Sequence, residues 1–113
     1  MPSATIANGA ALSGAVDLGS VIPGNEIVGL VMPIAWTAAA MTFQGSADGT
    51  NFYDLYNDAG TELNFTVGAS QAIGLRQDAR AILGRWRHIK VRSGTTGTPM
   101  NQGAERVITL IVK

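Results

Sequence analysis

The sequence predicts an all-β fold: an antiparallel β-sandwich or jelly roll of about eight strands, with at most one short helix. Three observations support this fold class. Short apolar stretches alternate with turn residues along most of the 113-residue chain. A strong hairpin signal, Asp48-Gly49, separates two strand-like segments. Only one segment, about residues 77–83, resembles a helix, and its two turns are too short to be stable alone.

The hairpin around Asp48-Gly49 is the clearest element. Met41 and Phe43 alternate with polar residues, as in a strand with one buried face. The second arm, residues 52–56, is rich in aromatic residues, which favour strands. Glycine accepts a positive φ, and an aspartate side chain can accept hydrogen bonds from its own turn. We therefore expect a tight connection between two paired strands.

Two other segments, residues 27–36 and 106–112, are apolar on both faces. A strand of an antiparallel sheet normally has one face in water. Two apolar faces predict a second sheet on one side and a loop or another subunit on the other. Pro33 cannot donate a ladder hydrogen bond, so the first strand should end or lie at an edge there. The closing strand is expected at the centre of its sheet.

The rest of the chain is expected to form short strands separated by turns. A turn is expected at Pro23-Gly24. In the segment 85–92, alternation places Arg87 on the face of Ile89 and Val91, and Trp86, His88, Lys90 and Arg92 on the other. The remaining strands are predicted at residues 15–18, 62–67, 71–75 and 85–92.

The length predicts one domain. Residues 1–13 are small and uncharged, with only Ile6 and Leu12 as possible anchors, so we expect a flexible N-terminal arm. Residues 14–113 should form a single sandwich. No charged segment precedes an apolar run, and no apolar run reaches about 18 residues, so neither a signal peptide nor a membrane partner is expected. The chain has no cysteine, which excludes disulfides and thiolate sites.

The net charge is zero, but the charges are segregated along the chain. Residues 1–62 hold six carboxylates and no base, whereas residues 63–113 hold eight bases and two acids. Strands from the two halves could interleave, so that the charges mix in space. Alternatively, complementary patches could join copies of the molecule or a lattice beneath it. The sequence leaves both interpretations open.

No catalytic residues are identified, and we do not expect an enzyme. His88 is the only histidine and has no carboxylate partner nearby in the sequence. The chain has no nucleophile elbow, phosphate loop or dinucleotide fingerprint. The oxygen-rich run between Asp48 and Asp58 lacks the order of an EF-hand loop and is ordinary for turns. Hence no metal and no cofactor are expected.

A nucleic-acid partner is not expected either. The basic stripe around Trp86 has the mixture of cations and an aromatic ring found in single-strand platforms. However, the pI is about 6.5 and the first half of the chain would repel phosphates. A solvated sheet face or a protein contact explains the stripe better.

Two parts of the chain resemble known families. Residues 43–55 resemble the "S-x-D-G, aromatic, aliphatic" hairpin of discoidin-type, galactose-binding-like jelly rolls, and residues 86–92 resemble a later strand of that family. This resemblance implies a β-sandwich. The ligand loops of that family have no recognisable counterpart here, so it implies no sugar site.

The whole chain more closely resembles small proteins encoded beside the capsid genes of tailed phages. The resemblance lies in residues 22–26, 32–36, 46–52 and 99–112. It implies a head decoration (cement) protein or another accessory structural protein of the virion. Such a protein is a β-sandwich on the outside of the head, often a trimer at threefold positions, and has no active site.

We therefore expect a viral structural protein that decorates a bacteriophage capsid and clamps neighbouring capsid subunits. Its partners would be the major capsid protein and other copies of itself in a homotrimer. It would be made in the host cytoplasm and lie on the exterior of the phage head in the virion. The expected capsid contacts are Ile6, Leu12, Arg85, Arg87 and Arg92.

The alternative is a carbohydrate- or host-surface-binding module of a phage fibre or tail. Aromatic rings stack on sugar rings, and the chain offers Trp36, Tyr53, Tyr56 and Trp86 for such contacts. The residues assigned to this role are Trp36, Tyr53 and Trp86. Aromatic residues on strands also serve as ordinary core residues, so this sequence alone does not decide between the two functions.

Overall fold

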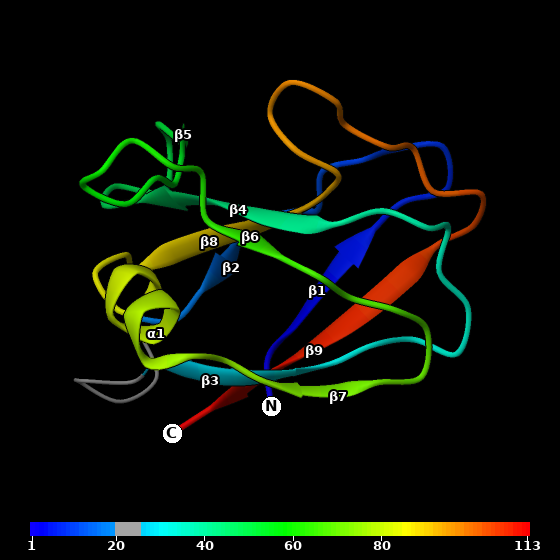
Figure 1. The fold of residues 1–113 in the computed structure, drawn as a ribbon, viewed down its shortest axis with the longest axis horizontal. Coiled ribbons are helices and arrows are strands. Elements are labelled where there is room, and N and C mark those ends of the chain that lie inside the picture. The colour runs from blue at the N-terminus through cyan, green and yellow to red at the C-terminus, as the bar shows by residue number, and fades with distance from the viewer. Residues whose placement is uncertain (20–25) are drawn as a thin grey trace.

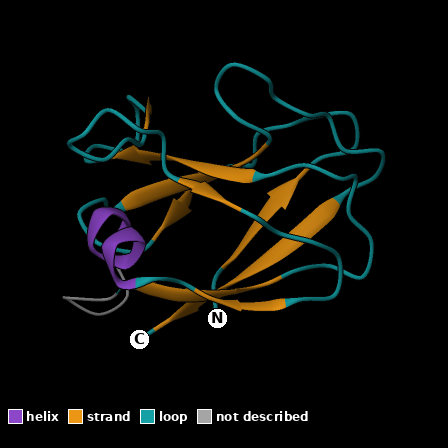
Figure 2. Ribbon diagram, in the orientation of Figure 1, coloured by secondary structure: helices purple, strands orange, loops and turns teal. Residues whose placement is uncertain are grey.

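The structure is a computed structural model that describes residues 1–19 and 26–113. This part of the chain forms two antiparallel sheets packed face to face, with one short helix at one end of the sandwich (Figures 1 and 2). The all-β sandwich predicted from the sequence is confirmed. Its elements are β1 (Ser3–Ile6), β2 (Val16–Asp17), β3 (Ile27–Val31), β4 (Met41–Ser46), β5 (Tyr53–Asp54), β6 (Asn64–Phe65), β7 (Ala72–Gly74), α1 (Gln77–Leu83), β8 (His88–Ser93) and β9 (Arg106–Val112).

Each sheet combines strands from both ends of the chain. Sheet A has the order β1-β9-β3-β7, and sheet B has the order β2-β8-β4-β5, with β6 also paired to β4. All of these pairs are antiparallel. The longest register lies in sheet B, where six residues of β4 pair with all six of β8. Most strand neighbours are therefore distant in sequence.

The core lies between the two sheets. Sheet A contributes Ile108 and Leu110, and sheet B contributes Phe43 and Val91, all without exposed surface. The ring of Phe43 meets that of Phe65 edge to face, with centroids 5.4 Å apart, a favoured arrangement of two aromatic rings. In a regular strand only alternate side chains reach this layer, and the others form the outer face of the sheet.

The predicted hairpin is present as β4 and β5, with Gly45 paired to Tyr53. Gly49 has a φ of +80°, a conformation that glycine adopts without a Cβ clash. The Asp48 carboxylate accepts hydrogen bonds from the backbone N–H groups of Thr50 and Asn51, each at 2.9 Å. The turn therefore owes its shape to the two residues that predicted it.

The helix α1 spans the predicted residues 77–83. Its buried residues are Ala79 and Leu83, and Gly84 forms its C-cap, with the backbone N–H donating to the carbonyl of Arg80. The helix covers the end of the sandwich where the two sheets separate (Figure 1). The chain then leaves the helix through a turn, so β8 begins at His88 and the predicted strand 85–92 starts three residues too early.

Both strands predicted to be apolar on two faces lie in sheet A. Strand β3 ends at Val31, before Pro33, and β9 lies in the centre of its sheet, as expected. A register shift between Ile27 and Gly29 lets both Ile27 and Leu30 reach the core, which simple alternation does not predict.

The first 13 residues are not an arm outside the sandwich. Strand β1 pairs with β9 over four residues, and Ala4 and Ile6 lie in the core. Leu12 forms a bridge with Arg92, which joins this segment to sheet B as well. The expected boundary at residue 13 therefore does not separate an arm from the fold. The expected turn at Pro23-Gly24 lies outside the described residues.

Gly45 gives a direct test of the packing at the end of sheet B. A Cβ at Gly45 would lie 2.7 Å from Cγ of Trp86 and 3.0 Å from a methyl carbon of Leu55. We expect Gly45→Ala to lower the free energy of unfolding by about 1–3 kcal/mol, because it overpacks these side chains. Chemical denaturation of the purified variant measures this change.

The matched control is Gly97→Ala. Apart from its two neighbours in the chain, no residue has an atom within 4 Å of a Cβ built at Gly97. This substitution should change the stability by less than about 0.5 kcal/mol. If both variants unfold at the same denaturant concentration as the wild type, this result would contradict the close packing of Trp86 against Gly45.

Candidate functional site

The outer face of sheet A is the most unusual surface of the molecule. In β9, Ile108 and Leu110 point to the core, so alternation directs Val107, Thr109 and Ile111 outward. The register then places the outward residues of the other three strands beside them. The face is formed by Ser3, Thr5, Gly29, Val31, Ala72, Gly74, Val107, Thr109 and Ile111.

This face carries no charged side chain within the four strands that the structure describes. Val31 is 40% exposed and Val107 is 44% exposed. No described segment covers them, although the apolar character of both faces of β3 and β9 predicted a cover on each side. A β-sheet with one solvated face normally carries polar and charged residues there. The outer face of sheet A is therefore a candidate contact surface.

The outer face of sheet B has the opposite character. The register places Lys90 beside Gln44, and Arg92 beside Thr42, with Asp54 across from Gln44. The ammonium of Lys90 lies 4.3 Å from the centre of the Phe52 ring, a cation–π contact. The outer face of sheet B thus carries charged side chains, whereas that of sheet A carries none. The lack of charge is therefore specific to sheet A.

Arg92 belongs to a buried ion cluster, not to an exposed basic stripe. Its side chain is 9% exposed and forms ion pairs with Asp54 and Glu62, and it also donates a hydrogen bond to Thr96 at 2.9 Å. Burial alone would raise the pKa of Asp54, but hydrogen bonds from Arg92 and Gln44 and the Arg92 charge lower it overall. The cluster fastens β5 and the 93–99 loop to β8, so Arg92 is unavailable as the expected capsid contact.

The other expected contact residues lie in different places. Ile6 has no exposed surface, so it cannot touch a partner while the fold is intact. Leu12 is half-buried. Arg87 is exposed and forms two hydrogen bonds with Asp17, at 3.0 and 3.1 Å, instead of lying on the face of Ile89 and Val91. The hydrogen bond from Arg87 lowers the pKa of Asp17 to about 2.

Arg85 is the one expected contact that is exposed without an ion pair to a described residue. Its backbone N–H donates to the carbonyl of Ile82, and that of Trp86 donates to Leu83. This turn directs Trp86 toward Gly45 on the inner face of sheet B, away from His88 and Lys90. The predicted stripe is therefore not a continuous surface.

The segregated charges are largely paired within the chain. Carboxylates of the first half meet arginines of the second half in four of the ion pairs among the described residues: Glu26–Arg80, Asp17–Arg87, Asp54–Arg92 and Glu62–Arg92. This finding favours charges that mix in space over separate complementary patches.

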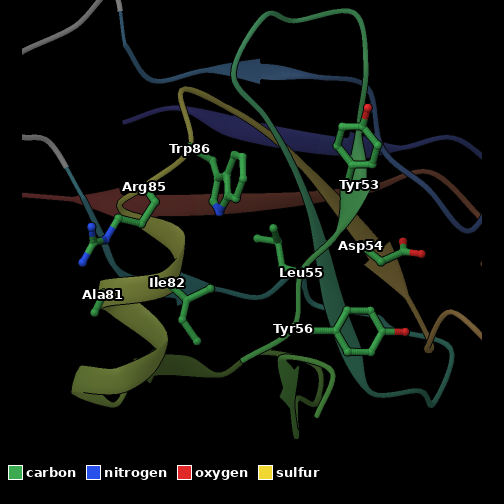
Figure 3. A pocket seen from close by; sticks show the side chains of 8 residues that line it. All are labelled: Tyr53, Asp54, Leu55, Tyr56, Ala81, Ile82, Arg85 and Trp86. Atoms are coloured by element: carbon green, nitrogen blue, oxygen red, sulfur yellow. The ribbon is translucent and has the colours of Figure 1, made fainter. Parts of the chain in front are cut away.

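A second candidate site is an aromatic cleft between β5 and α1. It has a volume of about 510 Å³. Tyr53, Leu55 and Tyr56 form one side, Ile82 and Ala81 come from the helix, and Trp86 closes the end (Figure 3). Tyr53 is 64% exposed and Tyr56 is 48% exposed, although both are aromatic.

The cleft unites only two of the three rings proposed to stack on a sugar. Tyr53 and Trp86 both line it, whereas Trp36 lines a different hollow, with Ala39 and Val67. The indole nitrogen of Trp36 donates a hydrogen bond to the carbonyl of Ala39 at 3.1 Å, which fixes the ring in its own loop. Ile82 was not identified from the sequence, because no local pattern shows that the helix lies opposite β5.

No metal-binding or membrane-spanning feature is found in residues 1–19 and 26–113. These residues contain no group of three or more His, Asp or Glu side chains suited to a metal ion. The only described helix is α1, whose seven residues are too few to cross a bilayer. The His88 ring packs against the Asp48-Gly49 turn, where its nearest atoms lie about 3.1 Å from a Cβ built at Gly49.

Comparison of the chain with protein-family models, curated proteins and solved structures finds no match.

The ion cluster around Arg92 gives a stability prediction. Arg92→Met leaves Asp54 and Glu62 partly buried without their cation, so we expect the free energy of unfolding to fall by about 3 kcal/mol. Arg87→Met is the control, because its pair with Asp17 is exposed and should contribute little. Urea denaturation compares the two variants, and equal losses would contradict the buried character of the Arg92 cluster.

The Asp17–Arg87 pair gives a pH prediction. A carboxylate with a lowered pKa stabilises the fold above its ordinary pKa, and this contribution is lost as the pH falls through the lowered value. The stability difference between wild type and Asp17→Asn should be constant above about pH 4 and should vanish toward about pH 2. Denaturation at a series of pH values measures it, and a difference that grows on acidification would disprove the ion pair.

Proposed function

We propose that this chain is a structural protein that decorates the outside of a phage head and stabilises it by joining neighbouring capsid subunits. The observation that carries the proposal is the uncharged outer face of sheet A, with Val31 and Val107 exposed on adjacent strands. Such a face has few polar groups to desolvate, so another flat surface can cover it at low cost.

The size of this face supports a repeated contact. Four strands spaced about 4.8 Å apart, with five residues at about 3.3 Å each, cover roughly 320 Å². A stable pairwise complex buries about 800 Å² on each partner. One such face alone therefore supports only a weak contact. Several copies held together on a lattice act at high effective concentration, which converts weak contacts into firm attachment.

The resemblance of residues 22–26, 32–36, 46–52 and 99–112 to proteins encoded beside phage capsid genes supports the choice of partner. On this proposal the partner is the major capsid protein, and the protein acts as a homotrimer on the exterior of the head. The three copies supply the multivalency that a single face of this size needs.

The proposal predicts that charge on the outer face of sheet A abolishes attachment. The double variant Val31→Lys/Val107→Lys places two cations on adjacent strands at positions already exposed, so the fold should survive. Heads purified without this protein should gain resistance to heat when the wild-type protein is added, and gain none with the double variant. Resistance is measured as the infectious titre that survives heating.

The control is Lys90→Glu on the outer face of sheet B. It changes the net charge by two units, as the double variant does, but with opposite sign and on the opposite sheet. It should stabilise the heads as well as the wild type does. Failure of wild-type protein to bind or protect the heads would refute the proposed function. Protection by the double variant would refute the assigned face.

A further inference from the structure

The most exposed large apolar side chain in the described part of the chain is Ile34, with 91% of its surface in solvent. It lies in the connection between β3 and β4, at the end of the sandwich opposite α1 (Figure 1). A single exposed apolar residue is ordinary on a protein surface. Ile34 differs from that case because the chain is held in place on both sides of it.

Hydrogen bonds fix the backbone before and after Ile34. The carbonyl of Pro33 accepts one from the backbone N–H of Ser70 at 2.8 Å. The backbone N–H of Thr37 donates to Oε1 of Gln102 at 2.8 Å, and the carbonyl of Thr37 accepts from Nε2 of the same side chain at 3.1 Å. Gln102 is itself only 1% exposed. Ile34 therefore has little freedom to fold back onto its own molecule.

A hollow of about 390 Å³ opens beside this segment. It is lined by Trp36, by residues 38–40 of the same connection and by residues 66–69, which lie between β6 and β7. Trp36 and Val67 also pack against the core. The rest of the lining consists mostly of alanine and glycine, which leaves room for a branched aliphatic side chain. Ile34 does not fill this space in its own molecule.

The surroundings of the hollow are uncharged. Residues 27–47 and 63–75, which supply both its walls and Ile34, contain no acidic side chain, no basic side chain and no histidine. Arg106 reaches this end from β9, but its guanidinium donates to Oε1 of Gln102 at 3.0 Å. An aliphatic side chain can enter without desolvating a charge, whereas a charged group would find no counterpart. The chemistry of the hollow therefore matches that of Ile34.

We propose that Ile34 of one copy inserts into the hollow of a neighbouring copy, so that copies of this chain associate through this end of the sandwich. Each copy carries both the isoleucine and the hollow, and the two lie at the same end. Copies that meet there can fill one another's hollows in a closed, symmetric assembly. The use of this contact, to hold copies together on a phage head, rests on the proposed function.

The contact should be weak in solution. A hollow that receives one isoleucine and its neighbours is much smaller than the roughly 800 Å² that each partner buries in a stable complex. We expect a dissociation constant of about 0.1–1 mM. On a lattice, where copies are held close together, the effective concentration is high enough for such a contact to form.

Sedimentation equilibrium of the full chain between about 20 µM and about 1 mM measures this association. Ile34→Glu should abolish it, and Ile34→Ala should weaken it by about 10–100-fold. The matched control is Tyr53→Glu, which changes another exposed large apolar residue, at the α1 end of the sandwich. It should associate as the wild type does. Each variant is first checked for a wild-type unfolding curve.

A larger side chain inside the hollow should also block the contact. Ala38 lines the hollow and is exposed, so Ala38→Leu adds an aliphatic side chain there without disturbing the core. This variant should weaken association by at least about tenfold. Its control is Ala59→Leu, the same substitution at an exposed position between β5 and β6. The control should leave the association unchanged.

A mixture of two defective variants tests the contact directly. Ile34→Glu keeps an intact hollow, and Ala38→Leu keeps an intact Ile34. The indole of Trp36, which lines the hollow, is the reporter. In NMR spectra of isotope-labelled Ile34→Glu protein, the indole resonance should shift when unlabelled Ala38→Leu protein is added. Unlabelled Ile34→Glu protein should leave the resonance in place, because it brings no isoleucine.

The proposal is overturned if the wild type stays monomeric up to about 1 mM, if Ile34→Glu associates like the wild type, or if the mixture leaves the Trp36 resonance unmoved. A hollow that receives only a capsid side chain or a small molecule would give the first result. The hollow and the outer face of sheet A share no residue. A monomer that still protects heads would therefore refute this contact alone, and association without protection would refute the proposed function alone.

Discussion

The pairing of β9 with both β1 and β3 is the interaction on which sheet A depends. The last strand of the chain supplies the hydrogen-bonding edge for two strands from its first third, and Ile108 and Leu110 anchor that strand in the core. The same alternation that buries these two residues directs Val107, Thr109 and Ile111 outward. Strand β9 therefore contributes to the core with one face and to the uncharged outer surface with the other.

The local elements were predictable because local chemistry determines them. Asp48-Gly49 specifies its turn by backbone hydrogen bonds and a positive φ, and the helix at 77–83 ends at Gly84. The role of the first 13 residues was not predictable in this way. Ile6 is buried only because β1 pairs with a strand about a hundred residues later, and no local pattern records such a contact.

The candidate sites show the same division. Alternation correctly indicated that β3 and β9 are apolar on both faces, but it assigned Arg92 to an exposed stripe. The partners of Arg92, Asp54 and Glu62, come from separate segments, so its burial follows from tertiary structure alone. Likewise Trp86 turns inward because Gly45 leaves space for its ring. The aromatic cleft exists because this turn, β5 and α1 meet at one end of the sandwich (Figure 3).

On the function that we propose, the outer face of sheet A is covered when the protein attaches to a phage head. The chain has no cysteine, so single substitutions Thr5→Cys and Lys90→Cys each place one thiol, on the outer faces of sheets A and B respectively. Alkylation rates of free and head-bound protein test the claim most directly. We predict that head binding slows labelling at Thr5→Cys by about tenfold or more and leaves Lys90→Cys unchanged. Unchanged labelling at Thr5→Cys, with protection at Lys90→Cys, would contradict it.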